Sequence, residues 1–346
     1  MRIERDAARA AFAESAGFDG DALVPLAGDA SARRYFRAAR RSDGAPAMLM
    51  DAPPETNEPI TAFLAIGRWL NDAGFSAPET FEADVESGFA LIEDLGDGVY
   101  AHLCDATPAI EAKIYAAATD ILAALAAQRP PEVLEWNGLE HPLSPYDAAV
   151  FRREAELVLD WWVPAAAGAE VSADYRAEFL ALIDQCADLA AGSPPVVTLR
   201  DYHAENLLWL PERPGMRAVG LLDYQDALSG VAAYDLVSLL EDARRDTSQA
   251  LRNAMCDRFL DASGIRDRAG FAAAYAALGA QRNLKILGIF ARLKARDGKA
   301  GYLSMTPRVW GHLQRDLAHP ALTPLKAFID ARIPAPTAER LARALA

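Results

Sequence analysis

Between residues 196 and 227, apolar runs lead directly into acidic and amide side chains that a hydrophobic core would not accommodate. VVTL ends in Arg200-Asp201, Asn206 opens the run LLWL, and RAVGLL ends in Asp223. PERPGM, which separates the last two runs, is typical of a turn, so those runs are expected to pair as an antiparallel hairpin. Asn206 then begins the first strand and Asp223 ends the second, which places both side chains at the same end of the hairpin.

Asp201 lies one short loop before Asn206 and is therefore expected to face the same space as Asn206 and Asp223. Two carboxylates that lie close together repel each other unless a cation compensates their charge. Oxygen atoms are the ligands of hard divalent cations, and Mg²⁺ commonly takes one or two protein carboxylates together with substrate phosphates. The pattern indicates a divalent-cation site, the alternative being that these residues only shape turns and strand ends.

Length, charge and cysteine spacing limit the class of protein. The chain has 346 residues, too many for one typical core, so two lobes are expected. A formal net charge of −14 repels the phosphates of DNA and RNA, which argues against a nucleic-acid partner. Cys104, Cys186 and Cys256 lie far apart, which favours free thiols in a reducing cytoplasm. The sequence shows neither a signal peptide nor an apolar run of membrane-spanning length, so no membrane association is expected.

The organisation of the chain changes near residue 100. RRYFRAA and APAMLMDA are expected to be strands joined by a turn, EPITAFLAIGRWLNDAG a helix, and GFALIEDLGDG another strand that runs into a turn. The later sequence is mostly helical, with Thr107-Pro108 as the expected cap and start of one helix and residues 173–191 as another. We therefore predict an α+β protein with a small β-rich lobe over residues 1–95 and a larger, mainly helical lobe over residues 96–346.

The motifs resemble those of known phosphotransferases. LRDYHAEN keeps Arg200, Asp201 and Asn206 in the register of the protein-kinase catalytic loop H-R-D-x-x-x-x-N, although Leu199 replaces the leading histidine. DYQ at 223–225 stands where kinases carry D-F-G. The arrangement resembles the aminoglycoside phosphotransferase and choline kinase branch, whose usual loop is H-G-D-x-x-x-x-N. This resemblance implies the bilobal protein-kinase-like fold.

Within that branch, the sequence is similar to the N-acetylmuramate/N-acetylglucosamine kinases of cell-wall recycling. The segments that carry this second resemblance are GDASARRYFR, MLMDAPPE, LIEDLGD, LRDYHAENLLWL and GLLDYQDALSGVAAYDLVSLLEDARRD. Together they extend over most of the chain. The resemblance implies ATP-dependent phosphorylation of the anomeric hydroxyl of an N-acetylated amino sugar during peptidoglycan recycling.

The resemblance also implies roles for the acidic and amide residues. Asp201 would accept or orient the proton of the attacking hydroxyl. Asn206 and Asp223 would hold Mg²⁺ against the phosphates of ATP. Asp235 is expected to cap the helix that follows it and to anchor the loop.

Four residues are candidates for binding the acceptor: Asn137, His203, Glu205 and Arg244. His203 occupies the position of the catalytic-loop lysine of protein kinases and could contact either the γ-phosphate or the sugar. For His203, a structural role with a hydrogen-bonded imidazole is an equal alternative. For Glu205, the equal alternative is an ion pair with a nearby arginine and no contact with substrate. Asn137 and Arg244 belong to segments that are plausible walls of a sugar pocket.

The nucleotide side of the pattern departs from that of protein kinases. The sequence has no G-x-G-x-x-G loop, and Met48 and Met50 stand where a kinase places its phosphate-pairing lysine. The charge must therefore come from elsewhere. The candidates are Arg33, Arg34 and Arg37.

LAGDASARRYFR is expected to cover the phosphates in place of the missing loop. Gly28 would allow close approach of the backbone, and amides around Asp29 and Ser31 would bind phosphate oxygens. Backbone groups near Glu93 and Leu95, in LIEDLGD, are expected to meet adenine. The alternative is an ordinary hairpin with a basic edge and a strand that ends in a turn.

The expected partners are ATP, Mg²⁺ and a small amino sugar, with the chain acting as a cytoplasmic monomer. Two other functions stay open. One is a kinase for an amine-bearing acceptor such as an aminoglycoside or choline, because an acidic surface suits a cation. The other is a nucleotide-binding pseudokinase that serves as a regulatory module, because the phosphate-pairing lysine is missing.

Overall fold

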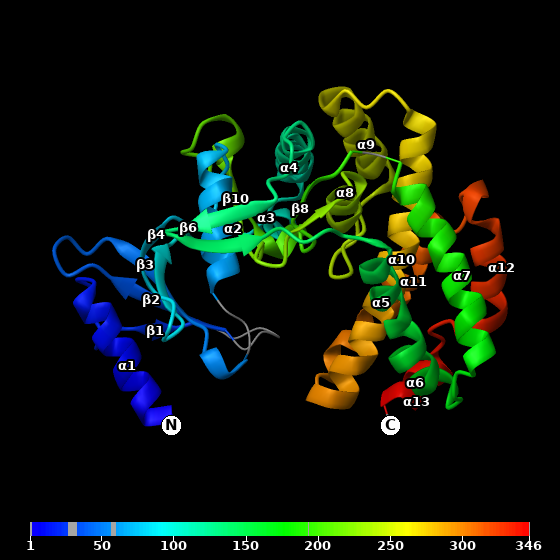
Figure 1. Ribbon diagram of the computed structural model, residues 1–346, viewed down its shortest axis with the longest axis horizontal. Coiled ribbons are helices and arrows are strands. Elements are labelled where there is room, and N and C mark those ends of the chain that lie inside the picture. The colour runs from blue at the N-terminus through cyan, green and yellow to red at the C-terminus, as the bar shows by residue number, and fades with distance from the viewer. Residues whose placement is uncertain (1, 27–32, 57–59, 193, 346) are drawn as a thin grey trace. The chain divides into compact units, whose positions relative to one another are not determined.

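The computed structural model describes residues 2–26, 33–56, 60–192 and 194–345, which form two compact units (Figure 1). Unit 1 comprises residues 1–117, 131–143 and 205–227, and unit 2 comprises residues 118–130, 144–204 and 228–346. Each unit therefore combines segments that are far apart in the sequence. The lobe boundary expected between residues 95 and 96 stays a prediction.

An antiparallel sheet forms the N-terminal part of unit 1. Within the described residues its strands follow the order β1-β2-β3-β5-β4. They are β1 (Val24–Pro25), β2 (Arg34–Ala39), β3 (Pro46–Asp51), β4 (Thr80–Asp84) and β5 (Phe89–Glu93). The strands expected from RRYFRAA, APAMLMDA and GFALIEDLGDG are thus confirmed as β2, β3 and β5. Burial alternates along β2, where Phe36 and Ala38 are buried, whereas β5, which lies between β3 and β4 in the sheet, is buried at four consecutive residues.

Helix α1 (Arg2–Ser15) packs on this sheet through apolar and ionic contacts (Figure 1). Phe12 stacks on Phe89, and Ala13 lies in the same buried cluster. The fully buried carboxylate of Asp51 accepts hydrogen bonds from three arginines, Arg5, Arg9 and Arg34. A buried carboxylate is tolerated only when it is paired, so these contacts fix α1 against the end of β3.

The rest of unit 1 consists of helices and two hairpins. Helices α2 (Thr61–Asp72) and α3 (Tyr100–Ala106) lie wholly within it, and α4 (Glu111–Ala126) is divided between the two units. The hairpins are β6–β7 (Val133–Trp136 and Leu139–Pro142) and β9–β10 (Leu207–Trp209 and Val219–Leu221). The helix expected from EPITAFLAIGRWLNDAG is confirmed as α2, which Gly74 ends with a φ of 89°.

Thr107 and Pro108 are the cap residue and the first residue of a helical segment, as expected, but the Thr107 side chain does not cap it and its first turn is not α-helical. Pro108–Ile110 form a short 3-10 helix, and α4 begins only at Glu111. The Thr107 side chain makes no capping hydrogen bond. Pro108 fits the first helical position because its φ is fixed near the helical value. The turn that begins there is a 3-10 turn, which is tighter than an α-helical turn.

Unit 2 is mainly helical. Its helices are α5 (Ala148–Leu157), the π-helix Val158–Trp162, α6 (Val163–Ala167), α7 (Ala173–Ala190), α8 (Ala233–Leu240), α9 (Gln249–Ser263), α10 (Arg268–Asp297), α11 (Thr306–Asp316), α12 (Thr323–Arg332) and α13 (Ala338–Leu345). Strands β8 (Val196–Thr198) and β11 (Leu228–Gly230) pair antiparallel. The helix expected over 173–191 is confirmed as α7, which Ser172 caps through Tyr175 N.

Helix α10 is the centre of unit 2, with α5, α7, α8 and α11 packed around it (Figure 1). Asp267 caps its start by accepting from Gly270 N at 2.9 Å, and Gly298 ends it with a φ of 69°. Alanine and leucine dominate the sequence between, which favours a long helix. Gly288 permits close approach of α5, because a Cβ there would collide with the backbone of Leu157.

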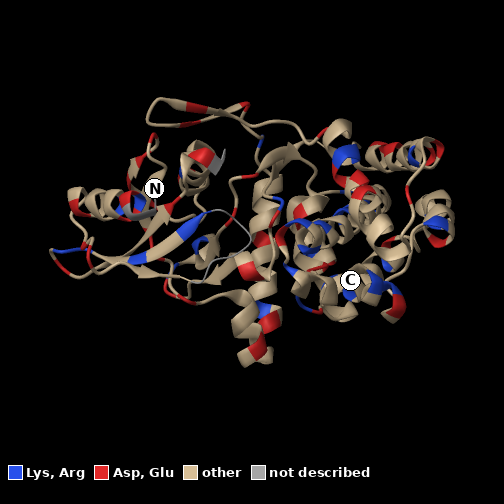
Figure 2. Cartoon of the chain, turned by 90° about the horizontal axis from the view of Figure 1, so that it is seen from below, with Lys and Arg blue, Asp and Glu red and all other residues tan. Residues whose placement is uncertain are grey.

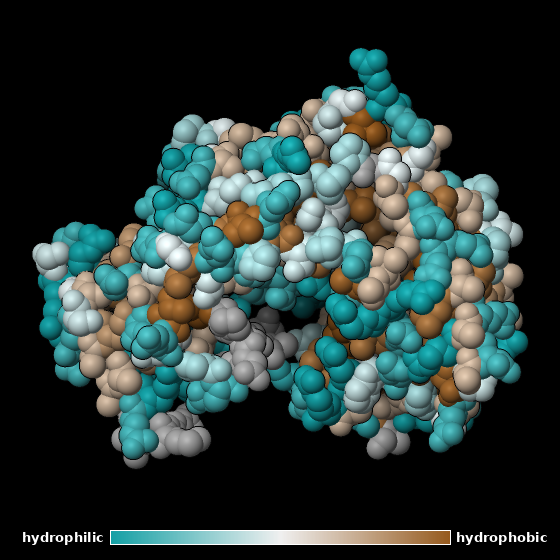
Figure 3. Space-filling model, in the orientation of Figure 1, coloured by the Kyte–Doolittle hydropathy of each residue, from teal (hydrophilic) through white to brown (hydrophobic). Residues whose placement is uncertain are grey.

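The surface carries both signs of charge. Figure 2 shows acidic and basic residues interspersed along the helices and strands of both units. The face shown in Figure 3 is mostly hydrophilic, with apolar residues in small patches, as is usual for a folded chain. In the described part of the chain, no helix combines the length and the apolar character that a membrane span needs.

Candidate active site

Asn206 and Asp223 meet at one end of the β9–β10 hairpin in unit 1, as the sequence predicts. Leu207 pairs with Leu221, so Asn206 and Leu222 lie just beyond that pair, and Asp223 follows Leu222. Leu222 N donates to Asn206 O at 3.0 Å, and Asn206 Nδ2 donates to Asp223 Oδ2 at 3.3 Å. The amide nitrogen of Asn206 thus faces a carboxylate, and its carbonyl oxygen is the atom that could bind a cation.

Asp223 is held in an unusual backbone conformation. Its φ is 56°, in the left-handed region that costs a non-glycine residue about 1–2 kcal/mol. The next residue, Tyr224, is fully buried and stacks on Phe63 of α2 with a centroid separation of 5.0 Å. Burial of Tyr224 therefore fixes the turn and leaves the Asp223 carboxylate exposed, with Gln225 Nε2 donating to its Oδ1 at 2.6 Å.

The pair fits a cation that keeps part of its coordination for substrate. Asp223 supplies one carboxylate and Asn206 one amide oxygen, both of them hard ligands. Among the described residues, no group of three His, Cys, Asp or Glu side chains forms a complete metal cage. A magnesium site of the substrate-bridging kind needs no such cage, because phosphates and water complete the octahedron.

Arg33, one of the three candidate phosphate cations, has a buried side chain that interacts electrostatically with Tyr224, the neighbour of Asp223. The other two candidates, Arg34 and Arg37, make ion pairs. Arg34 pairs with Asp51 at 3.3 Å, and Arg37 binds Asp94 at 3.0 Å and also Asp97.

The segment expected to meet adenine follows β5. Glu93 N already donates to Glu79 O at 2.8 Å, so an adenine contact at Glu93 would have to use its carbonyl oxygen. The Glu93 side chain pairs with Arg213. Asp94 shapes the following turn by accepting from Gly96 N at 2.8 Å. Leu95 packs near Gly220 of β10, which links this segment to the hairpin that carries Asp223.

The other candidate residues of unit 1 are Gly28, Asp29, Ser31, Glu205 and Asn137. Gly28, Asp29 and Ser31 lie outside the described residues. Glu205 is half-buried on the 3-10 turn Ala204–Asn206. Asn137 is exposed and forms, with Gly138, the turn of the β6–β7 hairpin; their φ values of 48° and 82° are those of a type I′ turn. The turn accounts for this Asn-Gly pair, and the sugar-binding role of Asn137 stays a prediction.

The loop that carries Asp201 belongs to unit 2 and is tied to α8. Leu199 N and Arg200 N donate to the two carboxylate oxygens of Asp235, at 2.6 and 2.8 Å. Asp235 lies in the first turn of α8, whose cap residue is Ala232. The expected loop anchoring is therefore confirmed, and the expected capping role is wrong. On the other side of Asp201, buried Tyr202 donates to Ala118 O at 2.8 Å.

His203 and Arg244, two of the candidates for binding the acceptor, lie in contact with each other. Arg244 Nη1 lies 3.4 Å from His203 Nε2. Since a guanidinium only donates, Nε2 must accept, which requires a neutral imidazole. Burial lowers the pKa of His203 to about 4, in agreement with that form. Arg244 itself is exposed on the segment after α8.

Two further residues near the loop carry no local signal in the sequence. Glu154 of α5 pairs with Arg200 and with Lys285 of α10. Both lie in ordinary helical patterns, and only the packing of α5 and α10 against the loop brings them together. The sequence signal that could have indicated Glu154 and Lys285 is a charged residue at a core-facing position of a helix.

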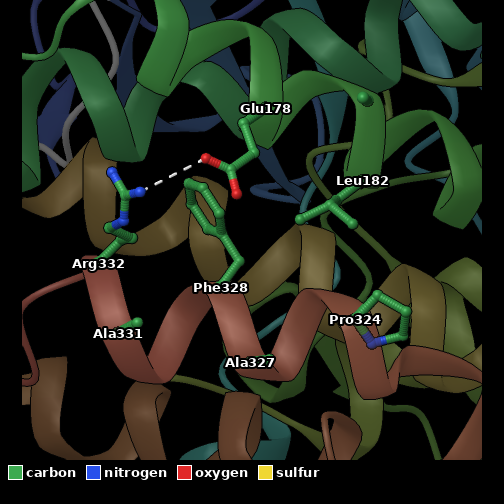
Figure 4. A pocket seen from close by; sticks show the side chains of 8 residues that line it. Glu178, Leu182, Pro324, Ala327, Phe328, Ala331 and Arg332 are labelled. Carbon is green, nitrogen blue, oxygen red and sulfur yellow. Dashed lines mark ion pairs between the residues drawn. The ribbon is translucent and has the colours of Figure 1, made fainter.

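A groove of about 520 Å³ on unit 2 does not coincide with these residues. It lies between α7 and α12, where Glu178 reaches toward Arg332 at 3.6 Å beside Phe328 (Figure 4). The site residues instead fall into two groups. Unit 1 holds Arg33, Glu93, Leu95, Asn137, Glu205, Asn206 and Asp223, and unit 2 holds Asp201, His203 and Arg244.

Comparisons with known proteins agree on one family. Residues 22–275 match the family model described as the phosphotransferase enzyme family. An N-acetylmuramate/N-acetylglucosamine kinase of Caulobacter vibrioides is 39% identical, over 97% of this chain and 99% of the relative. A protein of the same name from Pseudomonas putida is 35% identical, over 84% of this chain and 82% of the relative. The solved structure of a Plasmodium vivax ethanolamine kinase is similar in fold, with a TM-score of 0.55, 12% identity, and coverage of 88% of this chain and 84% of that chain.

Proposed function

Because this chain belongs to the phosphotransferase enzyme family, we propose that it transfers the γ-phosphate of ATP to the anomeric hydroxyl of N-acetylmuramate or N-acetylglucosamine. The observation that supports the proposal is the contact between Asn206 and Asp223 at the end of one hairpin, because each of these side chains carries an oxygen atom suited to a hard cation. The names of the relatives support the choice of acceptor. The product would enter peptidoglycan recycling.

Asp201 is the proposed base of this reaction. The anomeric oxygen forms a bond to the γ-phosphorus, the bond from that phosphorus to the β–γ bridging oxygen breaks, and ADP leaves. The hydroxyl proton passes to the Asp201 carboxylate or is oriented by it. The protein contributes mainly by positioning the reactants and stabilising charge, as phosphoryl transfer requires.

Asn206 and Asp223 are the proposed ligands of Mg²⁺, with Arg33 as the cation that replaces the missing lysine. Mg²⁺ would bridge the phosphates and neutralise charge that develops on them. Arg33 would bind phosphate oxygens through its planar guanidinium. Backbone groups near Glu93 and Leu95 would bind adenine, and Gly28, Asp29 and Ser31 would cover the phosphates.

His203 and Arg244 are the proposed acceptor-binding pair in unit 2, with Glu205 and Asn137 as further candidates. N-acetylmuramate carries a carboxylate that N-acetylglucosamine lacks. The exposed guanidinium of Arg244, already oriented by His203, is suited to a carboxylate. We also propose that the protein acts as a monomer in the cytoplasm, which light scattering of the purified chain and cell fractionation would test.

The test is incubation with each amino sugar, ATP and Mg²⁺, followed by phosphorus NMR of the product. An anomeric phosphate is expected, together with its loss in Asp201→Asn while ATP binding persists. A matched panel of kanamycin, choline and ethanolamine covers amine-bearing acceptors. Phosphorylation of one of these instead of the acetylated sugars would overturn the choice of acceptor. ATP binding without turnover on any acceptor would favour the pseudokinase.

A further inference from the structure

Glu154 is a buried carboxylate with donors on both oxygens. Its side chain is 7% exposed. Oε1 binds Arg200 and also Lys285, whose Nζ lies 2.8 Å away. Oε2 accepts from Tyr146 OH at 2.7 Å and from Gln281 Nε2 at 3.3 Å. Four donors from the Asp201 loop, α10 and the segment before α5 therefore converge on one side chain.

Asp201 adds a second negative charge beside this cluster. Arg200 and Lys285 are two cations, and Glu154 supplies a single negative charge. Lys285 also interacts electrostatically with Asp201, which provides the second. Although burial alone would raise it, Lys285 and Arg200 lower the pKa of Glu154 to about 2, so the carboxylate stays ionised at neutral pH.

Arg200, which joins Glu154 to Asp201, is restrained along its whole length. Its φ is 73°, a left-handed conformation that is uncommon for a non-glycine residue. Its N–H donates to Asp235 at 2.8 Å, and its carbonyl accepts from Ser238 Oγ at 3.3 Å. The guanidinium, held by Glu154, is the third restraint. These restraints hold the backbone immediately before Asp201, from which the Asp201 side chain projects.

We propose that Glu154 is a positioning residue for Asp201, acting through Arg200 and Lys285 to fix the direction in which the Asp201 carboxylate points. This rests on the proposed function, in which Asp201 orients the attacking hydroxyl. Glu154 does not contact substrate in this account. Its effect is therefore on the chemical step and not on the binding of either substrate.

A structural role without this coupling makes a different prediction for position 200. Glycine adopts a positive φ without a steric cost, so Arg200→Gly is compatible with the backbone conformation and removes the side-chain link to Glu154. If the left-handed backbone alone positions Asp201, this variant keeps its activity. If the link to Glu154 positions Asp201, turnover falls although the loop is free to adopt the same conformation.

The experiment measures kcat and KM for Glu154→Gln, Arg200→Gly and the double variant. Glu156→Gln is the matched control, because Glu156 lies on the same helix and pairs with Arg176 at 2.9 Å. Urea titrations of all variants identify any that fail to fold. Glu154→Asp tests the reach of the carboxylate, and we expect it to recover part of the turnover lost in Glu154→Gln.

We expect each single variant to lower kcat by about ten- to a hundredfold with KM changed less than about twofold, and the double variant to fall no further than the worse single variant. Independent, multiplying losses in the double variant would overturn the proposal, as would an unchanged kcat in folded Glu154→Gln. A wild-type protein that transfers phosphate to no acceptor would instead overturn the proposed function, and this role of Glu154 with it.

Discussion

Asp235 is a single residue whose carboxylate binds two backbone N–H groups outside its own helix. The donors are Leu199 N and Arg200 N, next to Asp201. Burial raises the pKa of Asp235 to about 7, although the two hydrogen bonds favour the charged form. The geometry of the Asp201 loop thus depends on both oxygens of this one side chain.

Asp235→Asn should therefore destabilise the protein and lower turnover. An asparagine presents an NH₂ group to one of the two N–H donors, which leaves a buried donor unsatisfied at a cost of about 1–3 kcal/mol. Urea titration at pH 7 measures the loss. Asp188→Asn, at an exposed position on α7, serves as the control and should leave the unfolding free energy unchanged. Equal stability of the two variants would contradict the anchoring role.

Arg33 is the residue proposed to bind phosphate in place of the lysine that kinases use, and its substitution tests that role. Loss of one charge-assisted phosphate contact weakens binding by about ten- to a hundredfold, so Arg33→Met should raise the Kd of ATP–Mg²⁺ by that factor. Arg33→Lys should recover part of the affinity, because it restores charge but not planar geometry. Isothermal titration calorimetry measures both variants.

The control for Arg33 is its neighbour Arg34. Arg34 pairs with Asp51, which keeps its partners Arg5 and Arg9 when Arg34 is replaced. Arg34→Met should therefore leave nucleotide affinity within about twofold of wild type. If Arg34→Met weakens ATP binding and Arg33→Met does not, the phosphate cation has been assigned to the wrong residue.

At the scale of elements, local patterns predict hairpins and helices but not their partners. The runs around PERPGM indicate one antiparallel hairpin, and its register places Asn206 beside Asp223 as expected. The Asn137-Gly138 pair is also typical of a hairpin turn, and it forms the turn between β6 and β7. Thr107-Pro108 indicates a helix start correctly but not the 3-10 turn that precedes α4.

Contacts between distant helices have no counterpart in the local sequence. Glu154, Arg200 and Lys285 lie in three separate segments of the chain. Taken alone, each is a charged residue that the sequence predicts to be exposed. The same is true of Glu241 and Asp316, two acids buried in unit 2. Such clusters are set by tertiary packing, which fixes side chains that are tens of residues apart.

Glu241 and Asp316 form a carboxyl pair at the ends of α8 and α11. Asn283 Nδ2 of α10 donates to both, at 2.8 and 3.0 Å, and a Cβ at Gly279 would lie 2.6 Å from Asp316 Oδ2. Burial and the neighbouring Glu241 raise the pKa of Asp316 well above 3.8, and burial raises that of Glu241. The unfavourable field of two helix C-termini acts in the same direction, so the pair retains a proton.

Asp316→Asn should stabilise the protein at alkaline pH relative to wild type. Because the folded pKa of Asp316 is raised, the folded protein keeps a proton that the unfolded chain releases above 3.8. The unfolding free energy therefore falls as pH rises from that value toward the raised pKa, with a slope of at most about 1.4 kcal/mol per pH unit. An asparagine supplies a permanent donor to Glu241 and removes this dependence.

Urea titrations between pH 7 and 9 make this comparison. Burial lowers the pKa values of His203 and His312 to about 4, so their contributions to the pH dependence lie below that range. Other groups that face the pair are shared by the two proteins: Arg252, Cys256, Tyr275 and Arg315. Parallel pH curves for Asp316→Asn and wild type would show that no proton is retained.

At the scale of the whole molecule, the proposed ligands are distributed between the two units. The nucleotide candidates Arg33, Asn206 and Asp223 belong to unit 1, as do the acceptor candidates Asn137 and Glu205, whereas the acceptor candidates His203 and Arg244 belong to unit 2. A ligand that binds only the folded state stabilises it by about 2.7 kcal/mol at a hundred times its Kd. Each ligand should therefore raise the unfolding temperature.

Two substitutions should separate these effects. Asp223→Asn should remove the rise in unfolding temperature caused by ATP–Mg²⁺ and leave the rise caused by N-acetylmuramate, because it removes the only carboxylate assigned to the metal in unit 1. Arg244→Met should do the reverse, and should weaken N-acetylmuramate more than N-acetylglucosamine, since only the former carries a carboxylate. Thermal unfolding of wild type and both variants, with each ligand alone, measures all of these shifts. If either substitution abolishes both responses, the assignment of Asp223 to the nucleotide and of Arg244 to the acceptor is wrong.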